Sequence, residues 1–385
     1  MLAAPRLGDR WWVRALTGIA GWSLVLLLLV ALVDAAGSPT DIRVLSTFLI
    51  FLVVALALQS FTGLTGIISF AHIGFMALGA YVAAILTTAP AIKLISIPDA
   101  PDFLVQAQLG FLTATAIAVA VTMLVAFVIG IPLVRLDGAP AAVATIGVLV
   151  IVNTVLANSG DLTRGAQAFY GIPRYTTPFV ALGAVILVLL VARLFRDSNT
   201  GLGLRSSRED SLGSEASGVE VTRSRLVAWT LSAGMAAAGG SLYAHYVQTI
   251  LPGGFMFDLT LVIMTMIIVG GPTVSGAVLG AMIVSIVTEF LRRAENDFSA
   301  PGLSTVVLGV LILMTMILRP SGLVGRWETD VWLRSRWERR TRRRERRGPG
   351  DGEQQQRSVQ ERTSHRARVM QHAREAAARA RNGEG

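Results

Sequence analysis

The sequence predicts an all-α, polytopic membrane protein of about ten transmembrane helices. The 385-residue chain is 53% hydrophobic, with a mean hydropathy of +0.59 and only 15% charged residues, whereas about a quarter of an ordinary soluble domain is charged. Its apolar runs approach the roughly 20 residues that a helix needs to cross a bilayer; they include residues 18–33, 44–58, 109–134, 179–194 and 303–318. No barrel-like alternation is visible, so helices must satisfy the backbone inside the membrane.

Composition excludes several kinds of chemistry. The chain has no cysteine, which rules out disulfides, thiolate metal sites, iron–sulfur clusters and cysteine nucleophiles. The four histidines are too far apart in sequence to predict a metal site. No GxxxxGK[ST] run is present. We therefore expect no metal, cofactor or nucleotide on this chain.

The first span is predicted to start from the cytoplasm. Arg6, Arg10 and Arg14 precede the first apolar run, and Asp34 and Asp41 follow it. Cytoplasmic segments carry an excess of Arg and Lys, so residues 1–17 are expected inside the cell. A cleaved secretory signal is the alternative, although the run is long for a signal core.

The second span, about residues 44–60, leads into a glycine-rich segment, residues 63–81. Glycine lets helix backbones approach closely, or breaks a helix where protein surrounds it. The segment is therefore expected to face other helices and the translocation path, with candidates Gly63, Gly66, Ser69, His72 and Gly79. A lone histidine in an apolar helix is most often a neutral packing residue; the alternative is that His72 lines the path.

Spans four to six are joined by loops of different character. We expect an outer loop at about residues 88–108, a fourth span to residue 134, a tight inner turn, and a fifth span at about residues 139–157. A polar outer loop follows, with candidates Thr163, Arg164 and Gly165, and Arg164 is expected to pair with Asp161 or to meet an acidic docking protein. The sixth span covers about residues 178–195.

A polar, charged loop at residues 197–225 separates two apolar halves. Ser206 or Ser207 is expected to cap a short helix that Gly218 ends. A short amphipathic helix on the cytoplasmic face of a membrane protein is a docking element for a soluble partner; a merely solvated loop is the alternative. The candidate contact residues are Arg208, Glu209, Asp210, Glu215, Ala216 and Gly218.

Four further spans complete the membrane domain, residues 18–325. The seventh covers about residues 226–247, and residues 261–290 hold two spans broken near Gly270 and Gly271, with Gly276 following. Glycine-broken segments in both halves predict an internal repeat around the path, although both also suit helix packing. Glu289 is expected to form a salt bridge with Arg292 and Arg293 rather than an ion site. The tenth span ends near residue 318.

The remainder, residues 326–385, is predicted to be a disordered, Arg-rich cytoplasmic tail. Tryptophans among the arginines suit anchoring on anionic lipid. Nucleic-acid binding is disfavoured because the tail is tethered to a membrane and has no folded readout module.

Five motifs in order resemble the permease family of branched-chain amino acid ATP-binding-cassette importers, in particular its M-type subunit. The matching residues are Ser69, His72, Phe75 and Gly79–Tyr81; Thr145, Asn158, Leu162, Thr163, Gly165 and Gly171–Pro173; Arg208–Asp210, Glu215, Ala216 and Gly218; the 269–281 segment; and Arg319–Leu323. The chain departs from the family pattern at Ala71, Arg164, Ser214 and residues 272–275.

The resemblance implies a transport subunit rather than an enzyme, in the plasma membrane of a prokaryote, with both termini in the cytoplasm. Its implied partners are two ATP-hydrolysing subunits that hold ATP and Mg, a second related permease, an extracytoplasmic solute-binding protein and a small-molecule substrate. In that family the 197–225 loop couples ATP hydrolysis to the spans. Alternatives are a urea, short-amide or sugar importer of the same architecture and, from another class, an ion-coupled secondary transporter, which would require paired intramembrane carboxylates.

Overall fold

Ten long helices account for the predicted spans. The computed structural model describes residues 11–298, 302–319 and 321–325, with residues 360, 364 and 368 in isolation. Contacts divide the chain into two units at residue 329, and all the elements named below belong to the first. Apart from those three isolated residues, the predicted tail lies outside the described residues. The long helices are α1 (Trp11–Ala36), α2 (Pro39–Thr65), α3 (Ala71–Thr87), α6 (Phe111–Leu133), α7 (Gly138–Asn158), α9 (Pro178–Asp197), α12 (Val221–Val247), α13 (Phe257–Gly270), α14 (Val274–Phe298) and α15 (Leu303–Leu318).

These helices confirm the all-α membrane class. Seven helices in the described part are long and apolar enough to cross a bilayer. The helices α3 and α15 are apolar but shorter, and the 27-residue α12 is less hydrophobic because it carries Arg223, Arg225 and His245 together with several serines and glycines. In the described part of the chain each of the ten helices coincides with one predicted span, in rough agreement with the expected number of about ten.

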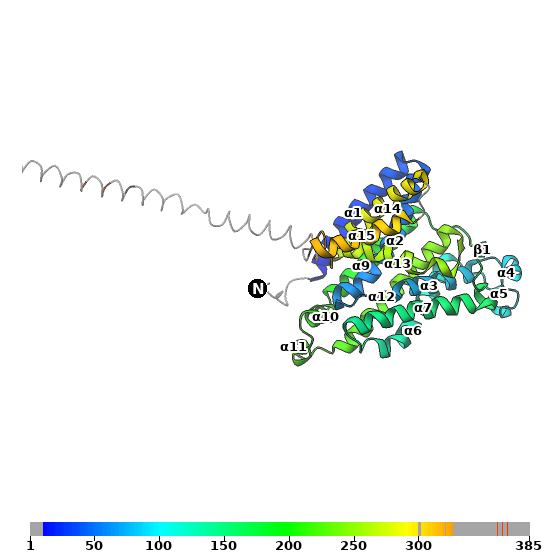
Figure 1. Ribbon diagram of the computed structural model, residues 1–385, viewed down its shortest axis with the longest axis horizontal. Coiled ribbons are helices and arrows are strands. Elements are labelled where there is room, and N and C mark those ends of the chain that lie inside the picture. The colour runs from blue at the N-terminus through cyan, green and yellow to red at the C-terminus, as the bar shows by residue number, and fades with distance from the viewer. Residues whose placement is uncertain are drawn as a thin grey trace, which may run out of the picture. The chain divides into compact units, whose positions relative to one another are not determined.

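The helices α3 and α12 form the centre of the bundle, with α2 and α6 against α12 (Figure 1). An added Cβ at Gly79 would overlap the backbone of Ala237, and one at Gly240 would overlap the Met76 carbonyl. The two helices therefore touch backbone to backbone. A histidine–hydroxyl contact lies near each end of this seam, His72 to Ser232 at 2.9 Å and His245 to Thr87 at 2.9 Å.

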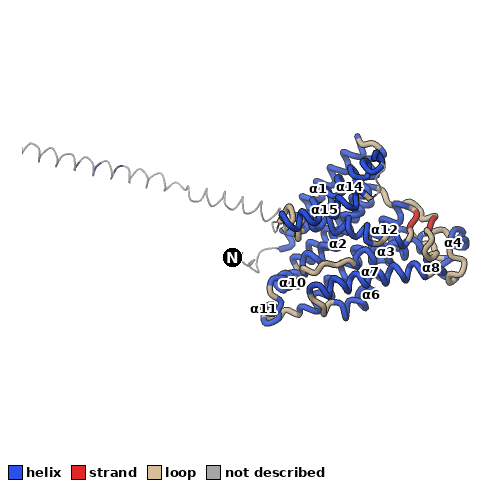
Figure 2. The backbone as a smooth tube through the Cα atoms, in the orientation of Figure 1, coloured by secondary structure: helices blue, strands red, loops and turns tan. Residues whose placement is uncertain are grey.

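Short elements gather at the two ends of the bundle (Figures 1 and 2). At one end lie α10 (Asn199–Glu209) and α11 (Ser211–Ala216). The opposite end holds α4 (Pro90–Ser96), α5 (Asp102–Gln106), α8 (Gly160–Thr163), the strands β1 (Phe169–Tyr170) and β2 (Thr249–Ile250), and the 3-10 turn η1 (Pro252–Gly254). The strands pair antiparallel, with Phe169 opposite Ile250.

The predicted loop at residues 88–108 is partly helical, and Lys93 organises it. Its buried Nζ donates to the carbonyl of Leu104 at 2.7 Å and to that of Ala107. These carbonyls end α5, so the lysine caps that helix. Burial lowers the pKa of Lys93 from its ordinary value. The sequence reasoning missed this fold because the capping cation comes from a different helix.

Two helix pairs break at a glycine with positive φ, as the sequence predicted. Gly66, with φ 76°, ends α2, and Gly271, with φ 106°, follows α13. The turn at residues 321–325 closes the second break, since Leu323 N donates to the Val269 carbonyl at 2.8 Å and Val324 N to the Gly270 carbonyl at 3.2 Å. The similarity of the two breaks fits an internal repeat, which stays a prediction.

Candidate functional site: the α10–α11 element

The polar loop folds into two short helices with their own capping residues. Ser198 caps α10, and the Asp210 carboxylate caps α11 by accepting from Gly213 N at 2.9 Å. Ser206 and Ser207 lie inside α10, so the predicted cap at these residues is wrong. Serine and aspartate are equally good N-caps, and the sequence offered several within a few residues.

The predicted end of the element at Gly218 is confirmed. Gly218 adopts φ 85° immediately after Ser217, the C-cap residue of α11. Its N–H donates to the Glu215 carbonyl at 2.9 Å, and Val219 N donates to that of Ser214 at 3.1 Å. These two bonds form a Schellman motif, in which a residue with positive φ satisfies the last helix carbonyls.

The α10–α11 element presents an exposed surface with one large apolar residue. All six predicted contact residues, Arg208, Glu209, Asp210, Glu215, Ala216 and Gly218, are exposed. Leu212 lies on α11 with 81% of its surface exposed, while Ser214 turns inward and its Oγ contacts Ser206 Oγ at 3.0 Å. Leu212 and the six exposed residues together form the outer surface of the α10–α11 element.

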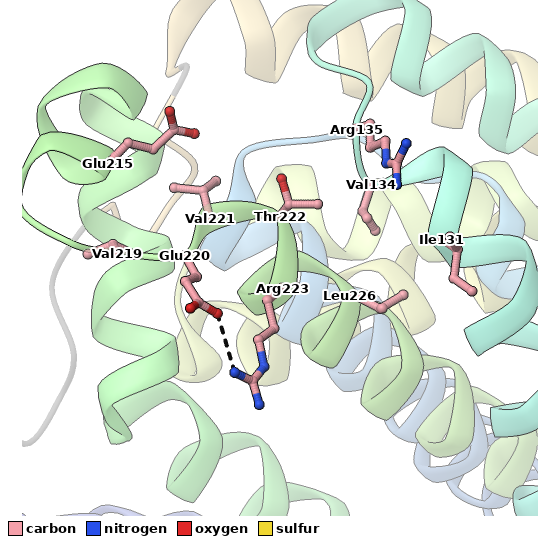
Figure 3. Close-up of a pocket in the computed structure, with 10 residues that line it drawn as sticks. All are labelled: Ile131, Val134, Arg135, Glu215, Val219, Glu220, Val221, Thr222, Arg223 and Leu226. Carbon is pink, nitrogen blue, oxygen red and sulfur yellow. Dashed lines mark hydrogen bonds and ion pairs between the residues drawn. The ribbon is translucent and has the colours of Figure 1, made fainter.

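A pocket of about 490 Å³ adjoins this element (Figure 3). Its apolar side comes from Ile131, Val134 and Leu226, and its polar side includes Glu215 and the Glu220–Arg223 ion pair at 3.3 Å. The remaining lining residues are Arg135, Val219, Val221 and Thr222. The hollow therefore joins α11 to the start of α12 and the end of α6.

An ion pair joins the start of α12 to the turn that follows α6. Arg225 of α12 is largely buried and contacts Asp137, in the turn between α6 and α7, at 2.6 Å. The Asp137 side chain is 67% exposed, and the pair connects the start of α12 to that turn. Arg208 makes a second link, donating to the Gly63 carbonyl of α2 at 2.9 Å.

His72 is fully buried and has hydrogen-bond partners on both ring nitrogens. Ser69 Oγ lies 2.8 Å from Nδ1, and Ser232 Oγ lies 2.9 Å from Nε2. The rings of Phe61, Phe75 and Trp229 surround it. Ser232 donates its own proton to the Trp229 carbonyl, so Nε2 of His72 is the donor to Ser232. This geometry fits the packing interpretation of His72.

The other path candidates lie between helices or at helix breaks. Gly63 and Gly79 are buried, and Gly79 lies in the α3–α12 seam. An added Cβ at Gly270 would overlap the Gly276 carbonyl, so these two glycines bring α13 and α14 together. Ser69 contacts His72, while Gly66 and Gly271 occupy the breaks. That these residues line a translocation path stays a prediction.

The Thr163–Gly165 turn lies at the opposite end of the bundle. Thr163 is buried and donates to the Ser159 carbonyl at 2.7 Å. Arg164 and Gly165 both adopt positive φ, at 69° and 64°. Arg164 donates to the Ala168 carbonyl at 2.7 Å and lies 4.6 Å from the Tyr170 ring centroid. These contacts replace the expected pairing with Asp161.

Glu289 forms the predicted salt bridges. It contacts Arg292 at 2.6 Å and Arg293 at 3.1 Å, both on its own helix. The carboxylate is therefore neutralised locally, as an interfacial residue rather than an ion site would be.

Sequence reasoning missed several residues of the site. Leu212 could have been found, because it is a large apolar residue in a polar stretch. Ser232 and the pocket residues of α6 could not, because their contacts join segments far apart in sequence.

Comparisons with known proteins agree with the geometry. The family model described as "Branched-chain amino acid transport system / permease component" matches residues 42–316, well over half of the chain. The chain is 27% identical to the high-affinity branched-chain amino acid transport system permease protein LivM of Salmonella typhimurium over 333 residues, covering 77% of this chain and 73% of that protein. LivM of Escherichia coli K12 is 27% identical over 322 residues, covering 74% and 70%.

A second group of relatives carries the name LivH. The LivH permease protein of Escherichia coli K12 is 25% identical over 299 residues, covering 73% of this chain and 92% of that protein. No solved structure matches the chain.

Proposed function

The chain belongs to the family of branched-chain amino acid transport system permease components, and from that premise we propose that it is the membrane subunit of an ATP-driven importer of branched-chain amino acids. The relatives are transport permeases, and the chain is a multi-pass membrane protein like them. ATP and Mg belong to two separate ATPase subunits. A second related permease and an extracytoplasmic solute-binding protein complete the assembly.

The observation that carries this proposal is the α10–α11 element. It combines an exposed leucine, exposed charges of both signs and an adjoining pocket of about 490 Å³. Its helices are capped internally and its base is tied to α2 by Arg208. When a soluble ATPase binds this surface, the capped and anchored element can transmit the ATPase's movement to the membrane helices.

The proposed orientation places the α10–α11 end in the cytoplasm of a prokaryotic cell. Arg6, Arg10 and Arg14 favour that side for the N-terminus. With ten spans, the residues after α15 return to the same side, where the Arg-rich segment can meet anionic lipid. The Thr163–Gly165 turn then faces outward and is the proposed contact for the solute-binding protein.

The translocation path is proposed to run beside the two glycine-broken helix pairs. Gly271 is buried in protein, where irregular backbone is tolerated inside a membrane, whereas Gly66 is exposed at the end of α2. The candidates that border it are Gly63, Gly66, Ser69, His72, Gly79, Gly270, Gly271 and Gly276. Urea, short amides and sugars are the alternative solutes for the same architecture.

An ion-coupled mechanism has less support. In the described helices, Glu289 is the carboxylate placed deepest in a spanning helix, and it is paired with two arginines of its own helix. The other acidic residues of these helices lie near helix ends. A coupling site requires a carboxylate free to exchange its ion.

The first test is transport by variants of the α10–α11 surface. Glu215→Arg reverses a charge beside the pocket, and Gly218→Asp places a side chain at φ 85°. We expect each to lower ATP-dependent uptake of labelled leucine by about tenfold or more, the scale of coupling free energies between sites. Uptake is measured in cells that also produce the partner subunits, at equal abundance of this chain.

The matched control is Asp99→Arg, which reverses an exposed charge at the opposite end of the bundle. Its uptake should equal that of the unaltered chain. Labelled urea is measured in parallel: loss of urea uptake alone would keep the mechanism and change the solute class. Normal transport by both surface variants would contradict the proposal.

A further inference from the structure

Arg208 connects α10 to the end of α2. Its Nη1 donates to the Gly63 carbonyl at 2.9 Å, a contact between residues 145 positions apart. The stem of the same side chain lies over Gly66, where an added Cβ would be 3.1 Å from Cγ and 3.4 Å from Cδ of Arg208. Although Arg208 is exposed as a whole, its guanidinium and stem both rest on the end of α2.

The contact supplies what the helix end lacks. Gly63 is in the last turn of α2, where carbonyls have no partner within the helix. Ile67 N, which would continue the helical pattern, instead donates to Thr65 Oγ1 at 3.2 Å. Arg208 therefore satisfies an orphan carbonyl and places a cation at a helix C-terminus, where the macrodipole favours it.

The segment that follows carries the polar contacts of the bundle interior. Phe70 N donates to Thr145 Oγ1 of α7 at 3.1 Å. Ser69 contacts His72, and His72 contacts Ser232 of α12. Residues 66–70 are thus tied to α7 and, through His72, to α12, while their upstream end is held by Arg208.

We propose that Arg208 is a positioning residue that transmits displacement of the α10–α11 element to the break between α2 and α3. The inference rests on the proposed function, in which an ATPase moves this element. When α10 shifts, the guanidinium displaces the end of α2 and the Gly66 turn with it. Gly66 is required twice, for its positive φ and for the space that the arginine stem occupies.

The test is the amount of solute imported per ATP hydrolysed by the full complex reconstituted in liposomes. Arg208→Ala and Arg208→Gln should lower this ratio by about fivefold or more, the lower end of coupling between sites. Arg208→Lys keeps the cation but not the planar fork, and should fall between. Loss of correctly assembled protein would lower import and hydrolysis together and leave the ratio unchanged.

Arg292→Ala is the matched control, because Arg292 is an exposed arginine paired within its own helix at the other end. Its ratio should equal that of the unaltered chain. If the Arg208→Ala protein does not accumulate in the membrane, the Arg208→Gln and Arg208→Lys variants are used instead, with the same ratio of solute imported to ATP hydrolysed.

A double-variant cycle isolates the contact between Arg208 and Gly66. Gly66→Ala adds a methyl group against the arginine stem as well as backbone strain, whereas Gly138→Ala, at φ 59° with open space around it, adds strain alone. We expect the effects of Gly66→Ala and Arg208→Ala on the ratio to be non-additive, and those of Gly138→Ala and Arg208→Ala to be additive.

The outcomes separate this inference from the proposed function. Absence of ATP-dependent uptake by the unaltered complex would overturn the proposed function itself. Normal uptake, together with unchanged ratios in the Arg208 variants or additivity with Gly66→Ala, would overturn only the role of Arg208.

Discussion

His72 illustrates how one polar side chain is accommodated in the bundle interior. It is fully buried and bonded to Ser69 and Ser232 within a cluster of aromatic rings. His72→Ala would leave two buried hydroxyls without this partner and open a void, so we expect a loss of about 2–4 kcal/mol of stability. The measurement is the thermal unfolding midpoint in detergent.

The same variant separates the two interpretations of His72. Ser232→Ala, which removes one of its hydrogen bonds, is the control and should cost less. An unchanged midpoint for His72→Ala combined with lost uptake would contradict the packing role and favour contact with solute.

Residues with a local structural reason could be predicted from the sequence. Gly66 and Gly218 end helices with positive φ, which glycine adopts without steric cost. The contact of Arg208 with Gly63 and that of His72 with Ser232 could not be predicted, because the partners are 145 and 160 residues apart. No spacing rule connects such pairs before the helices pack.

At the scale of elements, the seam between α3 and α12 gives a direct prediction. A Cβ at Gly240 would overlap the Met76 carbonyl, whereas one at Gly183 of α9 meets open space. Gly240→Ala should therefore force the two helices apart and lower the abundance of folded protein, while Gly183→Ala should be tolerated. Folded protein is measured by size-exclusion chromatography in detergent; equal yields of the two variants would contradict the close approach.

Helix existence was more predictable than helix limits. Apolar length fixes where spans occur, and all ten predicted spans are present as helices. The 197–225 loop and the 88–108 loop were harder, because short helices depend on caps. The carboxylate of Asp210 caps the start of α11. The ammonium of Lys93 caps the end of α5, which is a different helix from the one that carries it.

At the scale of the molecule, the turn at residues 321–325 closes the membrane domain. Its amides satisfy carbonyls at the end of α13. A chain ending after Gly325 keeps this turn and should accumulate and import leucine, whereas one ending after Arg319 should accumulate poorly. Immunoblots of membranes with uptake assays test this, and equal accumulation of both chains would show that the turn is dispensable.

Fold class and family could be predicted for the membrane domain, residues 18–325, because its hydropathy and five ordered motifs extend over most of that range. The packing of the glycine-rich segments against neighbouring helices could not be predicted from the sequence. A glycine can either pack tightly against another helix or line a translocation path. Only the backbone found next to it in the structure distinguishes these two roles. For Gly79 and Gly276 that neighbour is another helix.

The α3–α12 seam has a consequence for motion. These helices touch backbone to backbone in the middle, and a histidine–hydroxyl contact joins them near each end. Sliding or hinging between the two helices would break all three contacts at once, so α3 and α12 are expected to move as one rigid unit. A conformational change would then occur outside this rigid unit, at positions such as the Gly66 and Gly271 breaks, where the backbone is already bent.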